Sequence, residues 1–97
     1  MKKSTEAMPL VSAQIRGARA LLRWSAEDLA RASAVGLTTI RRAELTDQQT
    51  SLTAANDLAI RRTLETAGIE FIGENGGGVG VRLRYPRSSS PGGLAKN

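Results

Sequence analysis

The segment from residue 24 to residue 45 constrains the fold more than any other part of this chain, because it predicts two short helices separated by a very short break. Ser25 is placed to cap the first helix: its hydroxyl can accept from the backbone N–H of Asp28, whose carboxylate can reach back to Ser25. The apolar stripe breaks only at 34–36 and resumes at Ile40. A turn this short forces the two helices to cross steeply, which predicts a helix-turn-helix.

Two further helices flank this pair. Apolar residues repeat at helical spacing over 11–22, and after a polar loop the same period returns in a helix that starts at Ser51 or Thr53 and ends at Gly68. Gly17 lies inside the first of these helices, where glycine costs about 1 kcal/mol relative to alanine. We interpret it as a point of close packing, with a tolerated weakness as the alternative.

Beyond residue 68 the apolar period changes from helical spacing to alternation. Two alternating runs flank a glycine-rich stretch, which predicts a β-hairpin over 69–84. A nucleotide-binding glycine loop would instead lead into a helix. Because an isolated two-stranded hairpin is marginal in water, this one must pack either on its own helices or on a second copy of the chain. We favour a sheet shared in a dimer, through the alternating apolar residues Ile69, Phe71, Val79, Val81 and Leu83.

With 97 residues there is room for one domain. We expect a flexible N-terminus over 1–9, a helical domain over 10–68, the hairpin over 69–84 and a disordered tail over 85–97, where Pro, Ser and Gly are frequent. The predicted fold class is therefore mainly α, with four helices and a C-terminal β-hairpin.

The composition excludes several classes of site. The chain has no cysteine and no histidine, so we expect no disulfide, no zinc site, no thiolate nucleophile and no cofactor. The net charge of +5 suits a polyanionic partner, but it is spread along the chain, and an ordinary mixed surface explains it equally well.

No apolar run approaches the ~20 residues of a membrane helix, and the N-terminus lacks the apolar stretch of a secretory signal. We therefore expect a cytoplasmic protein.

From Gln14 to Ala67 the chain resembles the lambda-repressor-like Cro/XRE helix-turn-helix regulators. That family shows a helix of the form Q-x-x-L-A-x-x-x-G-V-S followed by x-x-x-I-x-x-x-E, and the matching positions here are Leu29, Ala30, Val35, Ile40 and Glu44. The resemblance implies a four-helix lambda-repressor-like fold and a structural ion pair between Arg19 and Glu44. Three positions depart from the family's pattern: Ala26 replaces a phosphate-binding glutamine, Ala34 a turn glycine and Gly36 a capping Ser or Thr.

The same resemblance implies where DNA would be contacted. Helical spacing over 37–45 directs Ile40 to the core and places Thr38 and Arg42 on the opposite face. By the family's pattern the residues that contact bases are Leu37, Thr38 and Arg42. We expect Thr39, Arg41, Gln48, Gln49 and Thr50 to contact phosphate. Without the motif, Arg41 and Arg42 would be interpreted as a solvated helix face.

The sequence thus predicts a non-enzymatic, sequence-specific protein that binds double-stranded DNA, a transcriptional repressor acting as a homodimer on a palindromic operator. One alternative is the antitoxin of a toxin–antitoxin pair, which also binds a toxin protein. Another is a protein-interaction module whose helix-turn-helix has lost DNA binding. An enzyme is disfavoured because the neighbouring carboxylates Glu27 and Asp28 diverge by about 100° on a helix and form no acid–base pair.

Overall fold

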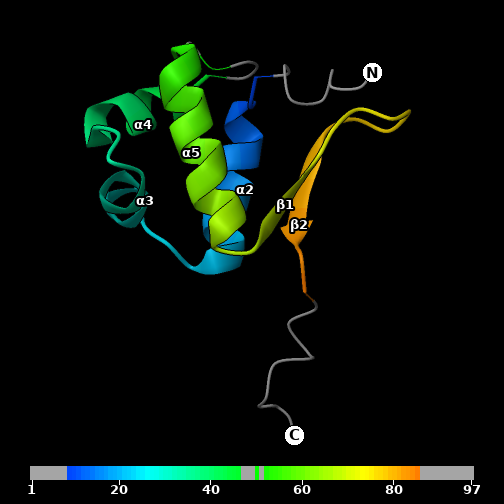
Figure 1. Cartoon of the computed structure of the whole chain (residues 1–97). Coiled ribbons are helices and arrows are strands. Elements are labelled where there is room, and N and C mark those ends of the chain that lie inside the picture. Colours follow the sequence, from blue (N-terminus) through cyan, green and yellow to red (C-terminus); the bar gives the residue numbers. More distant parts are fainter. Residues whose placement is uncertain (1–8, 47–49, 51, 86–97) are drawn as a thin grey trace, which may run out of the picture.

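Four helices and one antiparallel hairpin form the part of the chain that the computed structural model describes, residues 9–46, 50 and 52–85 (Figure 1). In chain order the elements are α2 (Ser12–Leu22), α3 (Ala26–Ser33), α4 (Leu37–Glu44), α5 (Ala54–Thr66), β1 (Ile69–Ile72) and β2 (Gly80–Leu83). This mainly helical class with a C-terminal hairpin is the one that the sequence predicts. Most of the expected flexible N-terminus (1–9) and of the expected tail (85–97) lies outside the described residues.

The helix ends form where the sequence supplies capping residues. The Ser25 hydroxyl accepts from the Asp28 N–H at 3.0 Å, and the Asp28 carboxylate accepts from the Ser25 N–H at 2.9 Å. This hydrogen bond from the Ser25 backbone lowers the pKa of Asp28 below its usual range. Thr53 caps α5 by accepting from the Asn56 N–H at 3.1 Å. Just after α5, Gly68 has φ +110°, a conformation that residues with a Cβ rarely adopt.

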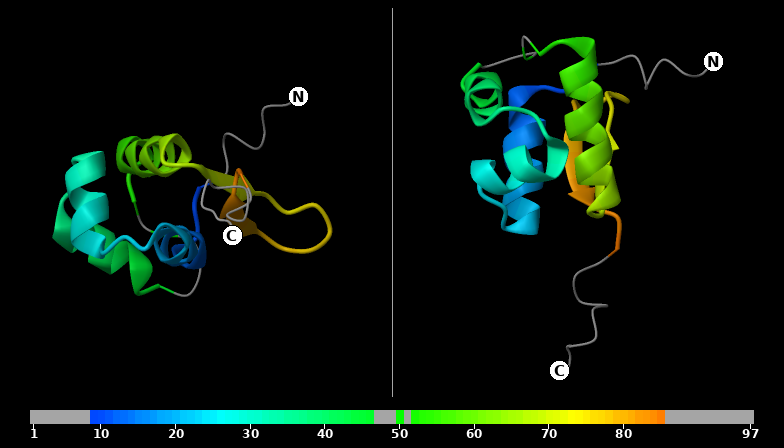
Figure 2. Two further views of the ribbon diagram at one scale, coloured as in Figure 1. Left: turned by 90° about the horizontal axis from the view of Figure 1, so that it is seen from below. Right: turned by 60° about the vertical axis from the view of Figure 1, so that its left-hand side comes forward.

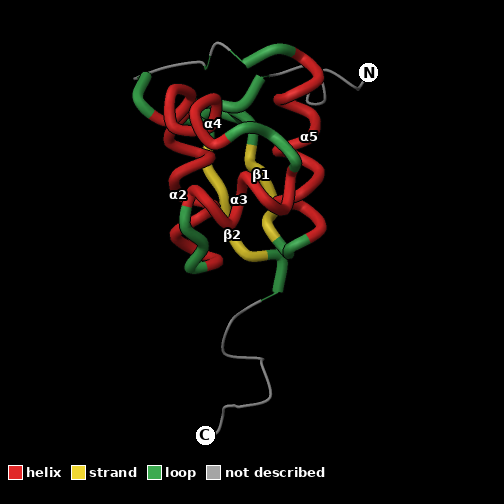
Figure 3. The backbone as a smooth tube through the Cα atoms, turned by 90° about the vertical axis from the view of Figure 1, so that its left-hand side faces the viewer, coloured by secondary structure: helices red, strands yellow, loops and turns green. Residues whose placement is uncertain are grey.

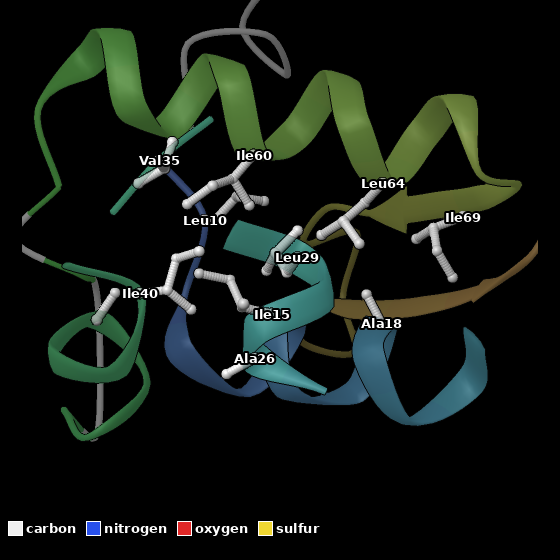
Figure 4. Packing of buried hydrophobic residues seen from close by; sticks show 11 residues of the cluster. Leu10, Ile15, Ala18, Ala26, Leu29, Val35, Ile40, Ile60, Leu64 and Ile69 are labelled. Atoms are coloured by element: carbon white, nitrogen blue, oxygen red, sulfur yellow. The ribbon is translucent and has the colours of Figure 1, made fainter. Parts of the chain in front are cut away.

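The hydrophobic core lies where the four helices meet the hairpin (Figure 4). Each helix contributes two buried apolar side chains, and Leu10, Val35 and the first residue of β1 complete the set: Leu10, Ile15, Ala18, Ala26, Leu29, Val35, Ile40, Ala43, Ile60, Leu64 and Ile69. Burying one Leu or Ile side chain contributes about 1.5–3 kcal/mol. Because every described helix is anchored in this one cluster, the orientation of α4 depends on the packing of all the others.

The hairpin packs on its own helices. Ile69 pairs with Leu83 and Phe71 with Val81, so these four side chains share one face of the pleat. Ile69 is fully buried, and the other three pack against the core with partial exposure. β2 contacts α2 and β1 contacts α5, and Figure 3, viewed from the side of α3, shows both strands behind the helices.

A sheet shared between two copies stays a prediction, because within one chain the apolar face of the hairpin already packs on the helices. The face is covered by the chain's own helices, and of the five expected interface residues Val79 is the exposed one, at 37%. The physical reason is the connection: α5 ends at Thr66 and β1 begins at Ile69, so the strand turns back directly onto the helical layer. Figure 2 shows the loop between the strands extending away from the helices.

A close contact and a buried amide join α2 to the hairpin. A Cβ atom on Gly17 would lie 3.1 Å from Cγ2 of Val81, which agrees with the interpretation of this glycine as a point of close packing. Gln14 is buried, and its side-chain amide donates to the carbonyl oxygens of Gly80 at 3.1 Å and Ile72 at 3.5 Å. Gln14 thereby satisfies backbone acceptors at the end of the hairpin ladder, where the loop begins.

Candidate nucleic-acid interface

α4 is a surface helix with one buried and one exposed side. Ile40 and Ala43 are buried in the core, whereas Thr38, Arg41 and Arg42 are exposed. The two sides follow from the helical period, which places residues three and four apart on the same face. α4 packs against α3 at one end of the molecule (Figure 1), so its outer side faces solvent.

The turn between α3 and α4 is short, and the residue with left-handed backbone conformation in it is an alanine, not a glycine. Ala34 ends α3 with φ +62°, a conformation that costs an L-residue about 1–2 kcal/mol. The Ser33 hydroxyl donates to the Leu29 carbonyl at 2.7 Å and accepts from the Val35 N–H at 3.2 Å, while Val35 is buried. α4 then begins after Gly36 with no side-chain cap. The buried valine and the serine bonds hold the turn in place of the missing glycine and cap.

An ion pair fixes α4 against α2. Arg19 donates from Nε to Oε2 of Glu44 and from Nη2 to Oε1, both at 2.8 Å, and from Nη1 to the Trp24 carbonyl at 2.9 Å. The two side chains are 22% and 10% exposed. The hydrogen bond to Glu44 raises the pKa of Arg19, so the guanidinium stays charged. This is the pair that the family resemblance implies, and its two hydrogen bonds tie the end of α4 to α2.

Among the residues expected to contact bases, two lie on the exposed side of α4 and one does not. Thr38 and Arg42 are exposed, and Arg42 makes no ion pair within the described part of the chain. Leu37 is half-buried and packs against the core. Its role in the first turn of α4 is therefore partly structural, because the short turn draws the start of the helix inward.

The residues expected to contact phosphate are spread over three environments. Arg41 is exposed but forms an ion pair with Glu27 of α3, with 2.9 Å between Nη2 and Oε2. Thr39 is half-buried on α4. Thr50 is also half-buried, and its N–H donates to the Leu10 carbonyl at 3.5 Å. The remaining two, Gln48 and Gln49, lie outside the described residues.

A basic hollow lies beside α4 that sequence reasoning did not identify. It measures about 330 Å³ and is lined by Arg16, Arg19, Ala26, Arg41, Glu44 and Leu45. Arg16 is exposed, and its guanidinium donates to the carbonyl oxygen of Glu44 at the end of α4. The signal in the sequence is the spacing of Arg16 and Arg19, three residues apart on one helix face. The hollow lies between the first turn of α3 and the arginines of α2 and α4. The helix dipole favours an anion at that first turn.

The described residues contain no group of acidic side chains that could hold a metal ion. No helix among them is long and apolar enough to cross a membrane. No protein-family model matches this chain, and no curated protein matches it either.

Proposed function

We propose that this chain is a transcriptional regulator, a repressor that binds double-stranded DNA sequence-specifically in the cytoplasm, on the nucleoid, through the outer face of α4. One observation carries the proposal: α4 is short, exposed along Thr38, Arg41 and Arg42, and buried along its opposite side by Ile40 and Ala43. A helix of about 10–12 Å diameter fits the major groove of B-DNA, which is about 12 Å wide. The lambda-repressor-like architecture is part of this proposal.

Arg42 is the residue to which the proposal assigns base recognition. It is exposed and without an ion pair in the described chain, so its guanidinium can donate two hydrogen bonds to O6 and N7 of a guanine. Such a contact contributes about 1–3 kcal/mol of discrimination between base pairs. Thr38 lies one turn earlier on the same side of the helix and offers a hydroxyl and a methyl group to the neighbouring base pair.

Arg41 and the basic hollow have the chemistry of a phosphate contact. Arg16 and Arg41 line this hollow, and both side chains are exposed. Phosphate contacts position a protein on DNA without reading its sequence. If Arg42 contacts bases, replacing it should change sequence specificity. If Arg16 and Arg41 contact phosphates, replacing them should change the salt dependence of DNA binding.

A homodimer completes the proposal. One recognition helix covers only a few base pairs, whereas two copies related by a two-fold axis would place their helices about 34–36 Å apart, one turn of the duplex. The expected target is therefore an inverted repeat.

The experiment is selection of bound fragments from sheared genomic DNA by purified protein at physiological salt, followed by sequencing. The test variant is Arg42→Ala, and the matched control is Arg82→Ala, which removes an exposed arginine from the hairpin. We expect wild type and control to enrich one inverted-repeat motif, and Arg42→Ala to lose it. Retention without any motif, or the same motif for all three proteins, would contradict the proposal.

A further inference from the structure

A second hollow lies between α3 and the C-terminal half of α5. Its volume is about 440 Å³, and it is lined by Trp24, Ala32, Arg62, Thr63, Thr66 and Ala67. Small-molecule sites typically span about 300–1,000 Å³. In Figure 1, α4 lies near the N-terminal end of α5. The residues of α5 that line the hollow, Arg62, Thr63 and Thr66, belong to the other end of that helix. The hollow and the exposed side of α4 are therefore separate surfaces.

The wall of this hollow combines one aromatic ring with small side chains. Trp24 is half-buried at the start of the helix-turn-helix and packs against the core. Ala32 of α3 and Ala67 at the end of α5 contribute only methyl groups, so space remains in front of the ring. A flat apolar group could lie against the indole in this space, as aromatic pairs do in protein cores.

Arg62 supplies a charge at the rim. Its neighbour Arg61 pairs with Asp57 at 3.8 Å and lies over the Phe71 ring, 5.4 Å from the ring centre. Arg62 is exposed and forms no ion pair with another described residue. Arg62 thus brings one guanidinium, with its fork of N–H donors, to a hollow that is otherwise mostly apolar.

We propose that this hollow binds a small aromatic carboxylate of the benzoate class, with the ring against Trp24 and the carboxylate on Arg62. A planar guanidinium and a planar carboxylate form two parallel hydrogen bonds. A free phosphate would leave the apolar wall uncovered, and a neutral aromatic compound would leave the guanidinium without a counter-charge. The site goes beyond the proposed DNA binding and does not depend on it, because ligand binding is measured without DNA.

The test uses the single tryptophan as a reporter. Sodium benzoate is titrated into the full-length ¹⁵N-labelled protein, and the resonance of the Trp24 indole N–H is followed by NMR. For a ligand of this size we expect a saturable shift with a Kd on the order of 1 mM. Benzamide has nearly the same shape but no charge, and we expect it to bind about tenfold more weakly.

Two variants separate binding from general surface effects. Arg62→Gln should weaken benzoate binding by about tenfold, whereas the control Arg82→Gln, on the hairpin, should leave the Kd unchanged. Ala32→Leu should fill the hollow from the exposed side of α3 and abolish binding, while circular dichroism and the melting temperature stay as in wild type. The proposal would be overturned if the Trp24 resonance showed no saturable shift at benzoate concentrations well above the expected Kd. Equal benzoate affinity of wild type and Arg62→Gln would also overturn it. Failure of this titration would leave the DNA-selection result unaffected.

Discussion

Replacing Glu44 with glutamine tests how firmly α4 is held against α2. The Arg19 and Glu44 side chains are 22% and 10% exposed, and both N–O distances are 2.8 Å. Glutamine keeps the size of the side chain but leaves the guanidinium without its counter-charge where water has little access. Losing one partner of a fully buried pair costs about 3–5 kcal/mol, whereas an exposed pair contributes about 0–1 kcal/mol. Because Arg19 keeps its bond to the Trp24 carbonyl and some access to water, we expect a loss of about 2 kcal/mol.

The assay is urea unfolding followed by far-UV circular dichroism. The midpoint should fall while the slope of the unfolding free energy with urea stays unchanged. A loss of about 2 kcal/mol corresponds to a melting temperature lower by about 8–16 °C for a domain of this size. Adding Arg19→Met and the double variant completes a thermodynamic cycle, which isolates the energy of the pair from the effect of each side chain alone.

The chain contains a matched control for this measurement. Glu70 also pairs with an arginine, Arg82, at 3.2 Å, but on the outer face of the hairpin, where the side chains of the arginine and the glutamate are 64% and 44% exposed. Glu70→Gln should leave the urea midpoint close to that of wild type, because water screens an exposed ion pair. Equal losses for Glu44→Gln and Glu70→Gln, or a coupling energy near zero in the cycle, would refute the reasoning that burial and two-pronged geometry make the first pair important.

Two further predictions concern the hairpin contact and the DNA-binding face. Gly17→Val should lower the unfolding free energy by about 2 kcal/mol, because the new side chain overlaps Val81. The control Ala13→Val, on the exposed side of α2, should lower it by less than about 1 kcal/mol. Equal losses of unfolding free energy in urea for the two variants would contradict the close packing at Gly17. Glu27→Gln should release Arg41 from its ion pair and raise the affinity for duplex DNA several-fold. The slope of log affinity against log salt concentration should steepen by the amount expected for about one additional phosphate contact. Fluorescence anisotropy with a labelled duplex measures both, and unchanged affinity and slope would show that Arg41 does not contact phosphate.

The local features of the fold were accessible from the sequence because each depends on a few neighbouring residues. The cap at Ser25 and Asp28 needs only their spacing of three, and Thr53 caps α5 in the same way. The end of α5 and the alternation that follows Gly68 locate the hairpin. The Arg19–Glu44 pair joins residues 25 positions apart, and only the family resemblance suggested it.

The parts that the sequence did not reveal depend on which elements meet in space. Alternation in the hairpin shows that one face is buried, but not whether its own helices or a second copy cover it. Gln14 looks like an ordinary polar residue of α2, yet it is buried, and its amide donates to two carbonyl oxygens of the hairpin. The hollow beside Trp24 is lined by Ala32 of α3 and by Ala67 just after α5, which are far apart in the sequence. Such features require the packing of α3, α5 and the hairpin to be known.

The position of the hairpin also bears on the proposed homodimer. Its apolar face is covered within one chain, and the large apolar side chains that remain exposed on the described surface are Leu45, Leu58, Val79 and Tyr85, at 82%, 44%, 37% and 71%. They belong to four different segments: the end of α4, the middle of α5, the hairpin loop and the residues after β2. Obligate dimers bury about 2,000 Å² or more through a continuous apolar interface, whereas these side chains are dispersed. The proposed homodimer is therefore better explained by two copies that meet on an inverted repeat, where each half-site positions one copy and the contact between them adds only a small part of the binding energy.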